Sequence, residues 1–126
     1  MSASRRKGTS WETEVVRHLN SHGFPYAERR ALYGSNDQGD VTGIPGVMLE
    51  CKAVREVTLA EFMDQVEAQT ENAHAQIGAA VIKRRMRPAK DGYVVMTLEQ
   101  FTGLLYRLEE HHAPQSKATD GLRRTS

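Results

Sequence analysis

Apolar positions recur at helical spacing in three segments of this 126-residue chain, so we expect three helices. Thr9 with Glu12, and Thr58 with Glu61, have the spacing of a capping box, which is typical of a helix start. The expected helices run from Thr9 or Ser10 to Gly23, from Thr58 to Ile77 with Gly78 as the stop signal, and over 98–108.

Short apolar runs lie between these helices and predict strands. Residues 33–39 form a loop by composition, and the Gly-Ile-Pro-Gly segment at 43–46 forms a turn. Because a helix connects two of the strands, the order of elements predicts an α/β fold with a mixed sheet flanked by helices. The expected strands cover 24–32, 40–42, 47–53, 79–83 and 93–96.

The composition is that of one globular domain. The chain has 17 Lys and Arg against 16 Asp and Glu, a net charge of +1, and 39% hydrophobic residues. Cys51 is the one cysteine, which excludes an intramolecular disulfide and a paired-cysteine zinc site. We expect a flexible basic N-terminus over 1–8, a single domain over 9–112 and a disordered tail over 113–126, where apolar periodicity ends.

No segment predicts a membrane protein or an ATPase. No apolar run approaches the ~20 residues of a membrane span, and the basic N-terminus lacks the apolar segment of a secretory signal. We therefore expect an intracellular, cytoplasmic protein. No G-x-x-x-x-G-K-[ST] loop is present, which argues against a dependence on ATP.

Two charged residues interrupt the apolar strand at 47–53. Because side chains alternate along a strand, Glu50 and Lys52 share one face with Met48. Cys51 points to the opposite face and is expected to be a small core residue. Burial of charged side chains is costly unless they are paired or bind a metal.

A turn places a second carboxylate beside this strand. The chain folds back at Pro45-Gly46, which can bring Asp40 next to Glu50. Two carboxylates and the ammonium of Lys52 then converge, and oxygen ligands of this kind suit Mg²⁺ or Mn²⁺. A hydrated divalent ion beside an ammonium group is what phosphodiester hydrolysis needs. The alternative is that Glu50 and Lys52 form an ion pair on an exposed edge strand, which would contribute little stability.

The order of these motifs resembles a known family. Gly39-Asp40 followed by Glu50-Cys51-Lys52 looks like the signature of the PD-(D/E)xK nucleases, with Gly39 in the place of the proline. Lys7-Gly8 with Glu12 is similar to the K-G-x-x-x-E opening of archaeal-type Holliday junction resolvases. Similar resolvases are encoded by bacterial viruses, which would place their action in the host cytoplasm. The resemblance covers 7–96 and continues through Gly23-Phe24, Arg29-Arg30 and the loop that holds Ser35.

The resemblance implies a restriction-endonuclease-like fold and a catalytic set of Glu12, Asp40, Glu50 and Lys52. Asp40, Glu50 and the backbone carbonyl of Cys51 would hold Mg²⁺, which Mn²⁺ can replace. Glu12 would face the metal from the first helix, and Lys52 would be the catalytic lysine.

The implied activity is that of a metal-dependent, structure-selective DNA endonuclease. Its substrate would be a four-way junction, cut by a homodimer because the two strands are cleaved symmetrically. One alternative is another nuclease of the superfamily, acting on linear, nicked or mismatched DNA. The other alternative is a non-catalytic DNA-binding module with a degenerate nuclease fold.

Clusters of basic residues would contact the DNA backbone. Such a run usually indicates only a solvated loop, but in a nuclease it is a natural phosphate-contacting element. The net charge hides this segregation, since acidic residues concentrate on 56–71, a face that we expect to turn away from DNA. The expected DNA-binding residues are Arg5, Arg6 and Lys7, then Arg29 and Arg30, then Lys83, Arg84, Arg85, Arg87 and Lys90, and by resemblance Ser35.

Three further features have a plainer interpretation. Glu12 can close its capping box, alone or in addition to a metal role. Gln65 and Gln69 lie one helical turn apart and could approach the metal site, although we favour their exposure to solvent. His18 and His22 have the spacing of metal ligands but no third partner, which favours an ordinary surface pair.

Overall fold

A mixed five-stranded sheet forms the centre of the protein in the computed structural model, which describes residues 3–30 and 39–112. The strands follow one another in chain order, and the β3–β4 pair is parallel while the other pairs are antiparallel. The strands are β1 (Glu28–Arg29), β2 (Val41–Thr42), β3 (Val47–Lys52), β4 (Ile77–Ile82) and β5 (Tyr93–Val95). The described helices are α1 (Ala3–Asn20), α2 (Leu59–Asn72), α3 (Leu98–His112) and the short 3₁₀-helix η1 (Ala89–Asp91).

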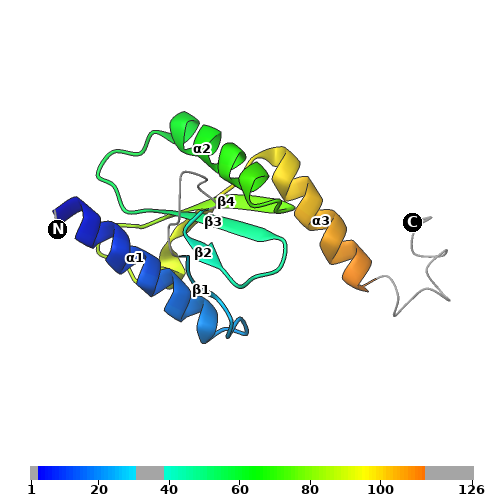
Figure 1. The fold of residues 1–126 in the computed structure, drawn as a ribbon, viewed down its shortest axis with the longest axis horizontal. Helices are drawn as coiled ribbons and strands as arrows, with labels where there is room; N and C mark the ends of the chain where they lie inside the picture. The colour runs from blue at the N-terminus through cyan, green and yellow to red at the C-terminus, as the bar shows by residue number, and fades with distance from the viewer. Residues whose placement is uncertain (1–2, 31–38, 113–126) are drawn as a thin grey trace.

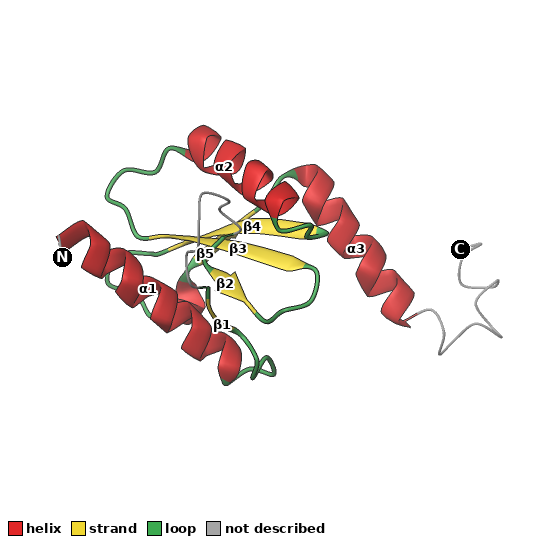
Figure 2. Cartoon of the chain, in the orientation of Figure 1, coloured by secondary structure: helices red, strands yellow, loops and turns green. Residues whose placement is uncertain are grey.

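Helices α1 and α2 cover opposite faces of the sheet (Figure 1; Figure 2). The core is divided accordingly, because successive side chains of a strand point to opposite faces. The α1 side contains Trp11, Val15, Ala27, Val41, Cys51 and Val81, and the α2 side contains Met48, Phe62, Val66, Ala80 and Ile82. The predicted alternation along β3 and the predicted core position of Cys51 are therefore confirmed.

Strand β4 is buried along its whole length, as expected for a parallel strand with a helix on each face. The sequence predicts that Gly78 ends the second helix, but α2 ends at Asn72 and Gly78 lies inside β4. A Cβ at this position would collide with Thr70 of α2. The predicted boundary is wrong because Gly78 serves the close approach of helix and sheet.

Helix α1 begins earlier than predicted. It starts at Ala3, so residues 3–8, expected to be flexible, belong to the helix. Thr9 is then inside α1 and does not cap its start. The indole Nε1–H of Trp11 donates to the Val81 carbonyl at 2.9 Å and ties α1 to the sheet.

The first predicted strand is reduced to β1 in the described residues. The side-chain amide of Asn20 donates to the carbonyls of Phe24 and Ala27, at 3.1 and 2.9 Å. These bonds hold 24–27 in a turn, so the predicted strand is wrong there. Residues 31–38 and the predicted disordered tail at 113–126 lie outside the described residues.

Helix α3 packs against the end of the sheet and then projects away from it (Figure 1). Gln100 accepts the Gly78 N–H through Oε1 at 3.0 Å on the packed side. The other side of α3 carries four large apolar residues that are each 44–79% exposed: Leu98, Phe101, Leu105 and Leu108. None of the described helices is both long and apolar enough to cross a membrane.

Candidate metal centre

The β2–β3 hairpin brings Asp40 next to the end of β3. The turn at 43–46 reverses the chain, so that β2 pairs antiparallel with β3. The Asp40 N–H donates to the Leu49 carbonyl at 2.9 Å, and Asp40 Oδ2 accepts the Cys51 N–H at 2.7 Å. The Asp40 carboxylate is therefore held beside the backbone that carries Glu50.

The glycine before Asp40 follows from the local backbone. Gly39 has a φ of +93°, whereas proline is locked near about −65°. A Cβ at Gly39 would lie 2.5 Å from the Met48 sulfur and 3.1 Å from the Leu49 carbonyl oxygen. The path that the chain takes into β2 therefore excludes proline at this position and fits glycine.

Glu50 is a buried carboxylate on the α2 side of β3, only 4% exposed. Its Oε2 accepts a hydrogen bond from Gln69 Nε2 at 2.9 Å and lies 3.7 Å from Lys52 Nζ. Lys52 Nζ also donates to Gln65 Oε1 at 2.7 Å and lies 5.1 Å from the centre of the Phe62 ring. The two charges do pair, but β3 has a strand on each side, so the edge-strand alternative is wrong.

Glu12 approaches the same region from α1. Its Oε1 accepts a hydrogen bond from Arg29 Nε at 3.3 Å, and its side chain is 19% exposed. Burial raises the pKa of Glu12, the negative charge of Asp40 raises it further, and Arg29 partly offsets both effects. Glu12 and Asp40 are thus near enough to repel each other.

Three carboxylates act electrostatically on Cys51: Glu12 on α1, Asp40 before β2, and Glu50 on β3 itself. Burial raises the pKa of the Cys51 thiol, and the charges of Asp40, Glu12 and Glu50 raise it further. The thiol therefore stays protonated and acts as a core group, not as a nucleophile. The three predicted acidic residues are thus near enough to Cys51 for their charges to act on its thiol, although Glu50 points to the α2 face of β3 and Cys51 to the α1 face.

The donor set at this point fits a hydrated divalent cation. Mg²⁺ typically takes one or two carboxylates and keeps several waters, so Asp40 and Glu50 are sufficient protein ligands. Glu12 is available as a further ligand, directly or through water, and a cation would relieve its repulsion with Asp40. Among the described residues, no group of three or more His, Cys, Asp and Glu side chains could hold a metal ion.

Two glutamines of α2 are part of this arrangement. Gln69 is 2% exposed, so the preference for solvent exposure is wrong for it. Gln65 is exposed as expected, yet it is bonded to Lys52. Gln69 stands seven residues after Phe62 and three after Val66, on the buried stripe of α2. That position in the stripe was the sequence signal for its burial.

The basic run at 83–90 is partly neutralised. Lys83 pairs with Glu14 at 3.3 Å, and Arg87 pairs with Asp91 at 3.1 Å. The remaining members of the run are the exposed Arg85 and Lys90, and Arg84, whose guanidinium lies 5.0 Å from the centre of the Tyr93 ring. Arg85 and Lys90 are exposed, and DNA contact by this loop stays a prediction.

The other expected DNA-binding residues have different surroundings. Arg29 pairs with Glu12, and its side chain is 45% exposed. Arg5, Arg6 and Lys7 belong to α1, but their side chains lie outside the described part of the structure. Ser35 lies outside the described residues altogether.

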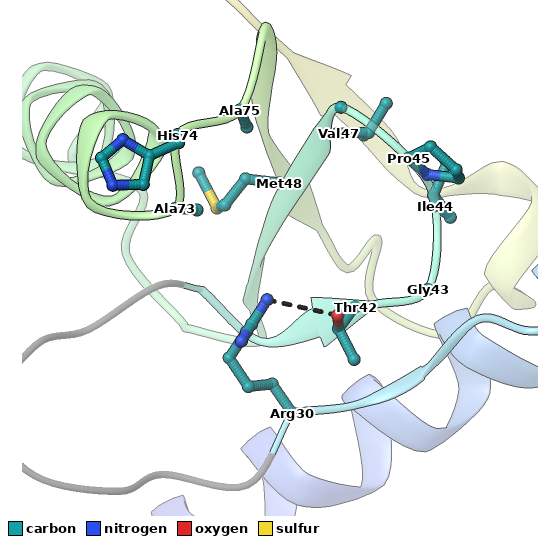
Figure 3. Close-up of a pocket in the computed structure, with 11 residues that line it drawn as sticks. Arg30, Thr42, Gly43, Ile44, Pro45, Val47, Met48, Ala73, His74 and Ala75 are labelled. Carbon is teal, nitrogen blue, oxygen red and sulfur yellow. Dashed lines mark hydrogen bonds between the residues drawn. The ribbon is translucent and has the colours of Figure 1, made fainter.

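Arg30 lines a cavity of about 330 Å³ (Figure 3). Its Nη2 donates to Thr42 Oγ1 at 3.2 Å. The cavity lies between the turn at 43–46 and the segment 73–75 that follows α2. Met48 lines it, whereas the predicted metal ligands do not, so the candidate metal centre is separate from this cavity.

No family model matches the chain, and no curated protein or solved structure matches it. The class that the structure itself defines is a mixed α/β protein with a five-stranded sheet. Its function must therefore be inferred from the site.

Proposed function

We propose that this protein is a metal-dependent DNA endonuclease of the PD-(D/E)xK superfamily that cuts four-way junctions. The observation that carries the proposal is that the Asp40 carboxylate bonds the β3 backbone at Cys51, between Glu50 and Lys52, which pair with each other. Glu12 is near enough to Asp40 for that charge to raise its pKa. Glu12 lies on α1, Asp40 directly precedes β2, and Glu50 and Lys52 lie on β3, in the order that the family signature requires. A mixed sheet between two helices supports the restriction-endonuclease-like fold that the signature implies.

Each residue of the centre has a role in this proposal. Asp40 and Glu50, with the Cys51 carbonyl and Glu12, would hold a Mg²⁺ or Mn²⁺ ion. Such an ion, when bound, lowers the pKa of a bound water and offsets negative charge on the phosphate. Lys52 donates hydrogen bonds to the attacking water or to the phosphate oxygen that gains charge in the transition state.

The proposed partners are branched DNA and a second copy of the chain. Exposed basic side chains, above all Arg85 and Lys90, would contact phosphates. Two active sites are needed for symmetric cleavage of two strands, and the exposed residues of α3 supply an apolar surface for a two-fold contact. Their spacing of three, four and three residues is that of a coiled-coil seam: Leu98, Phe101, Leu105 and Leu108.

The test compares cleavage of a synthetic four-way junction with duplex and flap DNA of the same sequence, in Mg²⁺. We expect cleavage of the junction and little cleavage of the duplex. Equal cutting of the duplex would instead indicate a superfamily nuclease that acts on linear or damaged DNA. If no substrate is cut and Glu50→Ala binds DNA as the wild type does, the protein is a non-catalytic binding module.

The dimer is tested separately by sedimentation velocity. Leu105→Glu places a charge in the middle of the exposed α3 seam, so we expect a monomer with an unchanged circular dichroism spectrum. Leu105→Met is the matched control and keeps the dimer. A dimer that persists in Leu105→Glu would place the interface on another surface.

A further inference from the structure

The spacing of two glutamines on α2 matches the spacing of two charged residues on β3. Gln69 meets Glu50 at 2.9 Å and Gln65 meets Lys52 at 2.7 Å, so α2 runs opposite to β3 along the sheet. Four helical residues advance about 6 Å, and two strand residues advance about 6.6 Å. The two pairs therefore remain in register, and one helix holds both charged side chains.

The two amides are oriented by the chemistry of their partners. A carboxylate only accepts hydrogen bonds, so Gln69 presents its Nε2–H to Glu50. An ammonium only donates, so Gln65 presents Oε1 to Lys52. Because Lys52 Nζ also lies 3.7 Å from Glu50 Oε2, the four side chains form one continuous chain of polar contacts.

Burial differs along this chain of contacts. Gln69 is 2% exposed and Glu50 is 4% exposed, so their bond is shielded from water. Gln65 is exposed, and the Lys52 side chain is 19% exposed, which leaves the ammonium accessible from solvent. A shielded hydrogen bond restricts the rotamer of its acceptor more strongly than an exposed one.

We propose that Gln69 is a positioning residue for the metal ligand Glu50, and that Gln65 is a positioning residue for Lys52. This inference rests on the proposed function, since it assigns these partners to the same centre. Gln69 fixes the carboxylate in the orientation that ligates the ion, as residues behind metal ligands commonly do. Gln65 holds the Lys52 ammonium at the edge of the site and does not bond Glu50. Loss of Gln69 should therefore affect metal binding, whereas loss of Gln65 should affect turnover.

The decisive measurement is Mn²⁺ binding to the full chain by calorimetry, without DNA. Gln69→Met removes the donor at nearly constant length, and we expect Mn²⁺ affinity to fall about 10–100-fold. Gln65→Met should keep the wild-type Mn²⁺ affinity but lower kcat for junction cleavage, with KM unchanged. Thr70→Val is the matched control on the same buried stretch of α2. The Thr70 hydroxyl donates to the Val66 carbonyl and does not bond Glu50 or Lys52, so this variant should change neither Mn²⁺ affinity nor kcat.

A purely structural role for Gln69 predicts a lower melting temperature with wild-type Mn²⁺ affinity, and that result would overturn the inference. If Gln69→Met does not fold by circular dichroism, Gln69→Asn decides, because its shorter amide no longer reaches Glu50 and must also lose affinity. Wild-type protein that binds Mn²⁺ but cuts no junction contradicts the nuclease, while Gln69 is still judged by affinity. Wild-type protein that binds no Mn²⁺ overturns both.

Discussion

The two faces of β3 are stabilised by different interactions. Toward α1, Cys51 packs with Trp11 and Val81 in an apolar cluster. Toward α2, Glu50 and Lys52 are held by glutamine amides within a cluster that is otherwise apolar. A buried ion pair contributes little stability compared with apolar packing, because desolvation offsets its attraction. The α1 face is therefore arranged for stability, whereas the α2 face carries the charges to which the proposed function assigns chemistry.

The candidate metal centre lies beside β3, on the side of the strand where Asp40 precedes β2. Asp40 bonds the β3 backbone through the Cys51 N–H and belongs to neither face. Glu12 reaches it from the α1 side and Glu50 from the α2 side. Substitutions on the two faces should consequently separate loss of stability from loss of activity.

The largest effect is expected at Asp40. Asp40→Asn should reduce single-turnover cleavage by on the order of 10³-fold, since it removes a charged ligand. Junction affinity should be equal or higher, because one negative charge near the phosphate is lost. The control is Glu14→Gln, a partly exposed acid on α1 that pairs with Lys83. Normal turnover of Asp40→Asn would show that the metal centre lies elsewhere.

The next effect concerns the apolar face. Trp11 is fully buried, and its indole is bonded to Val81. Trp11→Ala should lower the free energy of unfolding by about 3–5 kcal/mol, measured by urea denaturation. A loss below about 1 kcal/mol, the scale of a typical surface change, would contradict the assignment of stability to this face.

A smaller effect is expected from the basic loop, which belongs to neither face of β3. Replacement of Arg84, Arg85 and Arg87 by Gln should weaken DNA binding and flatten its salt dependence by about 0.9 per lost phosphate contact. Arg85→Gln should have a larger effect than Arg87→Gln, because Asp91 already neutralises Arg87. Cleavage at saturating DNA should stay unchanged. A salt slope equal to that of the wild type would mean that this loop does not touch DNA.

The smallest effect is expected at Glu12 in metal-free protein. Because the pKa of Glu12 is raised above its ordinary value of 4.5, the folded state holds this proton more tightly than the unfolded chain. The free energy of unfolding therefore falls as pH rises through the raised pKa. Glu12→Gln should remove that fall, so the variant gains stability relative to wild type above this range and gains none below it.

Urea denaturation in EDTA, at a pH well below and a pH well above 4.5, measures this difference. Arg29→Gln is the control, because loss of the partner should deepen the fall instead of removing it. Equal pH dependence of wild type and Glu12→Gln would mean that neither burial nor Asp40 raises the pKa of Glu12 in the folded protein.

Much of the fold is predictable from local patterns. The apolar run of β3, its alternation and the turn that precedes it all depend on near neighbours in the chain. The errors occur where a specific side-chain contact decides a boundary. Thr70 makes Gly78 part of a strand, and Asn20 holds 24–27 in a turn through side-chain bonds that no periodicity reveals.

The sequence by itself determined which residue types alternate on β3 and which acidic and basic groups are available for chemistry. Only the tertiary structure decided their partners. Gln69 reaches Glu50 across 19 residues of chain, and Glu12 reaches the site from the opposite side of the sheet. The physical reason is that periodicity is set within a turn or a strand, whereas a buried charge is satisfied by whichever element packs against it.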